Sequence, residues 1–332
     1  MDITIIEHID HTGVEAKNGI NYAFFRGKRK FFYLYRATLQ YIKKEKPDVV
    51  IVQGLIFPVQ VIAIRLILGK KTRIIVQHHG ELPYNGIRKS FQQVADRAID
   101  AYIFTAAANA KIWQDNGNVR TNSRCYEVLE ASTYFVRQDK EQSKLKLRIS
   151  GNNNFLWVGR LDANKDPLAV LKGFEKHLNI NPGAKLYMIY QYDGLLPEVK
   201  IMIANSQLLH GSVYLQGKIE HKELVYWYSA CDFFISGSYK EGSGYALIEA
   251  MACGCIPVVT RIPSFTKIIE NGKYGVLYKT GDADALFDLL KEIDKINKTE
   301  MSDKIVAYFS KHLSFQAIAD GLYDVIKKLL TE

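Results

Sequence analysis

The chain has 332 residues and only four cysteines, which follow no recognisable pattern. Cys125, Cys231, Cys253 and Cys255 lie at spacings that match neither a zinc site nor a disulfide framework. Cys253 and Cys255 flank Gly254 at a predicted turn from helix to strand, where small residues fit well. The scarcity of cysteine therefore favours reduced thiols in a cytoplasmic protein.

Long apolar stretches are also missing. No stretch approaches the roughly 18 uninterrupted apolar residues that a transmembrane helix needs, so we expect no such helix. The N-terminus lacks the basic-then-apolar pattern of a signal peptide. Hydrophobic residues nevertheless make up 48% of the chain, enough for two cores, and the length suits two α/β domains.

Acidic residues are scarce in the first half of the chain. Residues 1–150 hold 24 Lys and Arg against 14 Asp and Glu, a net charge of +10, whereas residues 151–332 carry −1. This asymmetry indicates an anionic partner for the first half. The segment RGKRKFFYLYR, from Arg26 to Arg36, mixes cations with aromatic rings and favours a membrane surface. A solvated loop followed by a buried helix face is the alternative, and nucleic acid fits less well because no usual recognition module is present.

Apolar strand-like runs alternate with helical patterns along most of the chain, which favours parallel sheets with helices on both faces. Strands are predicted at 3–7, 49–53, 74–78, 101–104 and 127–130, and again at 155–158, 186–190, 213–216, 233–236, 256–259 and 275–277. Helices are predicted at 31–46, 59–68, 167–178, 222–229, 245–252, 283–296 and 315–330. The polar stretch 138–153 is the best candidate for a linker between two domains.

The most informative stretch is EGSGYALIE, which runs from Glu241 to Glu249. Gly242, Ser243 and Gly244 form a flexible turn that opens a short helix between the two carboxylates. A helix N-terminus reached through glycines favours anions, because its backbone N–H groups point outward and its dipole is positive. The layout suits a ligand with phosphate in the middle and hydroxyl-rich groups at both ends, such as a sugar nucleotide.

A second segment, NFLWVGRLDANKDP at 154–167, carries two cations, Arg160 and Lys165, between a strand and a helix start. Cations at the carboxyl end of a strand suit a phosphate site in an open α/β sheet. A guanidinium and an ammonium group both pair well with diphosphate oxygens. Alone, two cations at this spacing are usually solvated surface residues, so their weight comes from the glutamate pair that follows.

Together these two segments resemble the donor site of retaining GT-B glycosyltransferases, in particular the family 4 type, also called glycosyl transferases group 1. The resemblance covers 151–332 and continues more loosely through 47–135. It implies an α/β fold of two Rossmann-like doubly wound domains that face a cleft. An acceptor-side domain is expected at 1–145, a donor domain at 151–312, and a helix that crosses back at 313–332. Because the opening residues lack the paired glycines of relatives, the first strand–loop unit is expected to be shortened or absent.

The resemblance also implies roles for individual residues. Glu241 would bind the sugar, Glu249 would hold the ribose, and Arg160 and Lys165 would neutralise the diphosphate. Backbone groups at Gly242, Ser243, Gly244 and Tyr245 would meet the same diphosphate.

Three further loops complete the expected site. His79 aligns with a family histidine that touches the sugar, although a pair of structural loop histidines is the alternative. The backbone of Lys218 and Ile219 would read the base. Residues 130–133 are expected to end the last strand of the first domain and to face the cleft.

The sequence therefore predicts a retaining, metal-independent glycosyltransferase of the hexosyltransferase type. Its donor, a UDP- or GDP-linked sugar, is a substrate, and no cofactor is expected. The acceptor would be a saccharide or a lipid-linked molecule in polysaccharide or glycolipid assembly, and the protein would be cytoplasmic and peripheral on the membrane. A GT-B sugar-nucleotide epimerase and a catalytically silent nucleotide-binding protein are the alternatives.

Overall fold

The computed structural model describes residues 2–26, 35–151 and 153–332, and the chain divides into two compact units. Unit 1 comprises Met1–Glu127 together with Tyr323–Glu332, and unit 2 comprises Val128–Leu322. Helix α14 (Phe315–Thr331) begins in unit 2 and ends in unit 1. Among the described residues, no helix is both long and apolar enough to cross a membrane.

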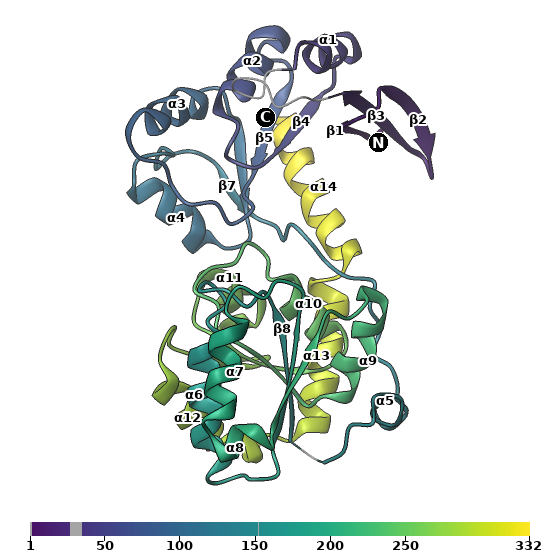
Figure 1. The fold of residues 1–332 in the computed structure, drawn as a ribbon. Helices are drawn as coiled ribbons and strands as arrows, with labels where there is room; N and C mark the ends of the chain where they lie inside the picture. The colour runs from purple at the N-terminus through teal and green to yellow at the C-terminus, as the bar shows by residue number, and fades with distance from the viewer. Residues whose placement is uncertain (1, 27–34, 152) are drawn as a thin grey trace. The chain divides into compact units, whose positions relative to one another are not determined.

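Unit 1 contains two separate sheets (Figure 1). Strands β4 to β7 form a parallel sheet in sequential order, whereas β1 pairs in parallel with β3, and β2 pairs antiparallel with β3. The strands are β1 (Thr4–Ile9), β2 (Gly13–Lys17), β3 (Ile20–Arg26), β4 (Val49–Gln53), β5 (Arg73–Gln77), β6 (Ala101–Phe104) and β7 (Cys125–Glu127). The helices are α1 (Arg36–Glu45), α2 (Pro58–Leu68), α3 (Gly86–Asp96) and α4 (Ala107–Asp115).

Unit 2 is built on one six-stranded parallel sheet with the order β10-β9-β8-β11-β12-β13. The strands are β8 (Asn154–Gly159), β9 (Lys185–Tyr190), β10 (Val213–Gly217), β11 (Phe233–Ser236), β12 (Ile256–Thr260) and β13 (Val276–Tyr278). The chain thus winds outward in one direction from β8 and then restarts beside it at β11. This is the order of a complete Rossmann sheet, and its switch point lies between β8 and β11.

Helices cover both faces of this sheet (Figure 1). One face carries α6 (Pro167–Leu178), α7 (Leu196–Ala204), α8 (Gln207–His210) and α12 (Ala283–Leu290), and the other carries α9 (Leu224–Ala230), α10 (Tyr245–Ala252) and α13 (Lys298–His312). Helix α11 (Pro263–Ile268) and the short 3-10 turns η2 (His221–Glu223), η3 (Glu270–Gly272) and η4 (Ile293–Lys295) complete the unit. The four central strands, β8, β9, β11 and β12, are mostly buried between these layers, as the near-continuous apolar runs of the sequence predicted.

Most predicted strands and helices of unit 2 are confirmed within a residue or two. The helix predicted at 283–296 ends at Leu290, and helices α7, α8 and α11 were not predicted. Two further differences have physical causes. The predicted linker carries helix α5 (Lys140–Leu147), which begins where the Asp139 side chain accepts a hydrogen bond from Gln142 N–H. It packs against α9, and Lys140 Nζ lies 2.6 Å from Asp232 Oδ1. Helix α13 was not predicted, because it buries few residues and the rest of its sequence is largely polar, so the apolar pattern is weak.

The loops that follow β8 and β11 are joined at the switch point. Tyr239 N–H donates to the carbonyl of Asn164 at 2.8 Å, and Asn164 Nδ2 donates to the carbonyl of Lys240 at 3.1 Å. A Cβ atom on Gly237 would lie 2.9 Å from the carbonyl oxygen of Asp166 and 3.1 Å from that of Lys165. Position 237 therefore requires glycine for lack of space, because both neighbours are backbone atoms.

We expect Gly237→Ala to reduce the free energy of unfolding by about 1–3 kcal/mol, since overpacking against backbone forces the two loops apart. Gly211→Ala is the matched control, because a Cβ there meets nothing within 4 Å. Denaturant unfolding of both variants measures the difference. Equal stabilities would show that the two loops can separate without cost.

Candidate functional site

The centre of the candidate site is an ion pair between Lys165 and Glu241. Lys165 Nζ contacts Glu241 Oε1, and the two side chains are only 20% and 14% exposed. Lys165 lies in the loop after β8 and Glu241 in the loop after β11, so the switch point of the sheet brings them together. The Ser264 hydroxyl donates to the Glu241 carbonyl at 3.1 Å and holds that loop from the side of α11.

Arg160 and Lys165 share a partner that sequence reasoning missed, Asp162. Its Oδ1 accepts a hydrogen bond from Lys165 N–H at 3.0 Å, and its Oδ2 lies 3.1 Å from Arg160 Nε. The Arg160 guanidinium also lies over the ring of Tyr192, 4.5 Å from its centroid, while the Arg160 side chain is 63% exposed. Arg160 therefore lies near Lys165 in the sequence and makes its own contacts to Asp162 and Tyr192.

The glycine turn before α10 has the geometry that the sequence predicted. Gly244 caps the helix in the left-handed region, with φ of 64°, and an added Cβ would lie 2.6 Å from Phe265 Cε1. Ser243 is buried, and its hydroxyl oxygen accepts a hydrogen bond from Glu130 N–H at 3.3 Å. Tyr245, the first helical residue, is 60% exposed. The helix start with its positive end therefore lies directly after Glu241.

Glu249 lies on the same helix and is 6% exposed. Its carboxylate has a hydrogen-bond partner at each oxygen: the Tyr228 hydroxyl donates to Oε2 at 3.0 Å, and His221 Nε2 lies 2.6 Å from Oε1. Neither Tyr228 nor His221 was singled out from the sequence. His221 lies in η2, only two residues after Ile219, so it brings the loop of Lys218 and Ile219 to the side of α10.

That loop begins at Gly217, the last residue of β10, which has a φ of 67°. Lys218 is exposed, whereas Ile219 packs against the core of unit 2. The structure therefore places the predicted base-reading loop at the carboxyl end of a strand, where open α/β sheets bind ligands.

His79 belongs to unit 1 and follows the end of β5. Its Nε2 lies 2.7 Å from Gln53 Oε1 at the end of β4, and its N–H donates to Glu81 Oε2 at 2.6 Å. Glu81 also accepts a hydrogen bond from Leu55 N–H at 3.0 Å. Glu81 is thus a second residue that sequence reasoning missed, and it joins the loops after β4 and β5.

Residues 130–133 differ from their prediction, because β7 ends at Glu127 and these residues lie outside any strand, in unit 2. Their anchor is Ser132, whose hydroxyl donates to the Leu313 carbonyl at 2.6 Å. Burial, and next the charge of Glu130, raise the pKa of Tyr245. Residue 130 therefore influences the start of α10 as well as the chain that enters unit 2.

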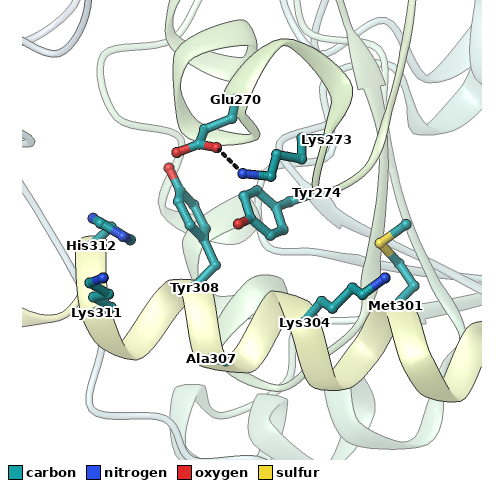
Figure 2. Close-up of a pocket in the computed structure, with 9 residues that line it drawn as sticks. All are labelled: Glu270, Lys273, Tyr274, Met301, Lys304, Ala307, Tyr308, Lys311 and His312. Atoms are coloured by element: carbon teal, nitrogen blue, oxygen red, sulfur yellow. Dashed lines mark hydrogen bonds and ion pairs between the residues drawn. The ribbon is translucent and has the colours of Figure 1, made fainter.

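A surface pocket in unit 2 contains none of the predicted site residues. It is lined by Glu270, Lys273, Tyr274, Met301, Lys304, Ala307, Tyr308, Lys311 and His312. Lys273 Nζ lies 3.0 Å from Glu270 Oε2, and the rings of Tyr274 and Tyr308 stack with centroids 4.0 Å apart. Figure 2 shows these side chains in the pocket. No group of three or more histidine, cysteine, aspartate or glutamate side chains among the described residues could hold a metal ion.

Comparison with known proteins places this geometry in a family. The family described as Glycosyl transferases group 1 matches residues 138–312. The alpha-monoglucosyldiacylglycerol synthase of Streptococcus pneumoniae is 29% identical over 174 residues, which cover 51% of this chain and 38% of that protein. The N-acetyl-alpha-D-glucosaminyl L-malate synthase of Bacillus anthracis is 27% identical over 238 residues, 68% of this chain and 60% of that protein. The chain thus spans less than two thirds of the length of either relative.

Solved structures share the fold at low sequence identity. Sucrose-phosphate synthase from Thermosynechococcus elongatus has a TM-score of 0.74 at 15% identity, covering 99% of this chain and 89% of that one. The Anabaena protein HepE in complex with UDP also has a TM-score of 0.74, at 16% identity, covering 88% of this chain and 81% of that one. The predicted GT-B fold is therefore confirmed. Because the family match spans more than half of the 332 residues and includes both carboxylates and both cations of the site, this chain belongs to the glycosyl transferases group 1 family.

Proposed function

We propose that this chain transfers a sugar from a nucleotide-diphosphate sugar to an acceptor hydroxyl, with retention of the anomeric configuration and without a metal ion. The observation that carries the proposal is the contact between Lys165 and Glu241 at the switch point, directly before the glycine turn of α10. A cation, a carboxylate and a helix N-terminus thus lie within the two loops that follow β8 and β11. A diphosphate and a sugar need these three groups side by side.

The proposed chemistry follows from the position of each group. Lys165 and Arg160 neutralise the leaving diphosphate, together with the backbone at the start of α10. Glu241 stabilises the positive charge that develops on the sugar ring in an oxocarbenium-like transition state. The bond between the anomeric carbon and the diphosphate oxygen breaks, and the acceptor oxygen bonds to the same face of that carbon. An oxygen of the leaving diphosphate takes the proton of the acceptor hydroxyl.

The named relatives support the choice of donor and product class. HepE has been solved with UDP and with UDP-glucose, and the Streptococcus pneumoniae relative is named for a glucosylated diacylglycerol. We therefore extend the proposal to a UDP- or GDP-linked donor and to an acceptor in glycolipid or polysaccharide assembly.

The direct test is a thermal-shift panel of UDP-, GDP-, ADP- and TDP-sugars, because a ligand that binds only the native state raises Tm by mass action. The sugar nucleotide that shifts Tm is then incubated with acceptors, and the anomeric configuration of the product is read by NMR. If no sugar nucleotide shifts Tm, the proposed donor class is wrong.

We expect Lys165→Ala and Arg160→Ala each to weaken binding of the free nucleoside diphosphate by about 1.5–3 kcal/mol, the contribution of a hydrogen bond to a charged group. Lys200→Ala is the control, because Lys200 is an exposed lysine on α7, outside these loops. Titration calorimetry gives the three affinities. Unchanged affinity in folded Lys165→Ala protein would remove this lysine from the site.

We expect substitutions of the two carboxylates to affect different parameters, kcat in one case and nucleotide affinity in the other. Glu241→Ala should reduce kcat on the order of a hundredfold, because it acts where charge develops, with a smaller effect on nucleotide affinity. Glu249→Ala should chiefly weaken nucleotide binding, because a ribose contact is made in the ground state as well. Glu198→Ala, an exposed glutamate on α7, is the control. If Glu249→Ala reduces kcat and Glu241→Ala chiefly weakens nucleotide binding, the two assigned roles are exchanged.

We further propose an anionic membrane surface as a partner of unit 1, which supports a lipid-linked acceptor. The support is the net charge of unit 1, which holds 21 Lys and Arg against 13 Asp and Glu, a net of +8, together with the Arg26–Arg36 segment, of which 27–34 lie outside the described residues. Each cation near an anionic surface contributes about 1 kcal/mol, so three or four suffice for reversible binding.

Co-sedimentation with vesicles tests this partner. Wild-type protein should pellet with anionic but not with neutral vesicles at low salt, and salt should release it. A variant with Arg26, Lys28, Arg29 and Lys30 changed to glutamine should pellet less. Equal pelleting of the two proteins would show that this segment plays no part.

A further inference from the structure

Glu249 is the carboxylate that the proposed function assigns to the ribose, and each of its two oxygens has a side-chain partner within unit 2. The Tyr228 hydroxyl donates to Oε2 at 3.0 Å, and His221 Nε2 lies 2.6 Å from Oε1. The Glu249 side chain is 8% exposed, so its rotation is limited by packing as well.

The two partners differ in surroundings. Tyr228 is fully buried on α9, and burial, followed by the charge of Glu249, raises its pKa well above the ordinary value. Its hydroxyl therefore remains protonated and acts as a donor to the carboxylate. Tyr228 is a fixed part of the core that directs one oxygen of Glu249.

His221 reaches the other oxygen from the surface. Its side chain is 70% exposed, and its ring stacks on Phe135 with centroids 4.9 Å apart and planes 29° apart. An exposed imidazole contributes little to core packing. Its stacking on Phe135 and its contact with Glu249 therefore indicate a role other than core packing. The contact lies at the end of the loop that carries Lys218 and Ile219.

A carboxylate offers about four lone-pair positions, two on each oxygen. His221 and Tyr228 occupy one position on each oxygen, which leaves one position on each for a further donor. Two adjacent hydroxyl groups match this arrangement, and the 2′- and 3′-hydroxyls of a ribose are such a pair.

We propose that His221 and Tyr228 are positioning residues, which fix the Glu249 carboxylate so that each oxygen presents one acceptor position to the vicinal hydroxyls of the donor ribose. The inference rests on the proposed function, because it takes Glu249 as the ribose carboxylate. This positioning preorganises the site, because the ribose meets a carboxylate that is already ordered and binding need not order it.

The test compares two ligands on four variants by calorimetry. The ligands are the nucleoside diphosphate that wild type binds and its 2′,3′-dideoxy analogue. The variants are His221→Ala, His221→Gln, Tyr228→Phe and the control His210→Ala, which changes an exposed histidine at the end of α8.

We expect His221→Ala and Tyr228→Phe each to weaken binding of the ribonucleotide about tenfold and to leave binding of the dideoxy analogue unchanged. His221→Gln should restore most of the loss, because its amide can donate to the same oxygen. His210→Ala should match wild type. With the full sugar donor, the two damaging variants should raise KM and leave kcat nearly unchanged.

The outcomes separate this inference from the proposed function. If wild type binds no nucleotide, the proposed function fails and the inference falls with it. If wild type binds nucleotide but His221→Ala binds it equally well, or loses affinity for both ligands alike, the positioning role is wrong and the proposed function stands. Should Tyr228→Phe not fold, the His221 variants decide alone.

Discussion

The reversal of strand order between β8 and β11 is the constraint on which the candidate site depends. Two adjacent parallel strands end at the same edge of the sheet, and the helices that follow them leave toward opposite faces. The two loops that follow these strands lie at this edge, and hydrogen bonds from Tyr239 to Asn164 and from Asn164 to Lys240 join them. Gly237 lets their backbones approach, and the Lys165–Glu241 ion pair closes the contact.

The ion pair also explains how two glutamates of one helix–turn segment can differ in chemistry. Glu241 contacts the Lys165 ammonium, and its side chain remains partly exposed, at 14%. Glu249 is buried and is held by a tyrosine hydroxyl and an imidazole. One position suits a developing positive charge, and the other suits neutral hydroxyl groups. Two carboxylates in unlike environments are a recurring way to divide roles within one site.

The sheets of unit 1 are arranged differently from the sheet of unit 2. Its parallel sheet adds β4 to β7 in one direction, and β1 belongs to a separate sheet with β2 and β3. The loops after β4 and β5 are joined through Glu81, which bonds to the backbone of Leu55 and of His79. The Glu81 carboxylate thus holds the loop of His79 through backbone N–H groups at the carboxyl edge of the sheet.

Sequence alone determined the features that rest on local signals. These signals are short apolar runs of three to six residues, Gly244 before a helix, and Asp166 with Pro167 at another helix start. The strands of unit 2 and the glycine turn could therefore be predicted. Spacing and residue type likewise singled out Arg160, Lys165, Glu241 and Glu249, because their chemistry suits a sugar nucleotide.

Tertiary structure alone decided which side chains meet. His221 and Tyr228 approach Glu249 from 28 and 21 positions earlier in the chain, and neither has a sequence signal that distinguishes it from an ordinary surface or core residue. The same holds for the packing of α5 against α9 and of α13 against α10. These contacts depend on the order of strands and on helix packing, which bring distant residues together without leaving a local pattern in the sequence.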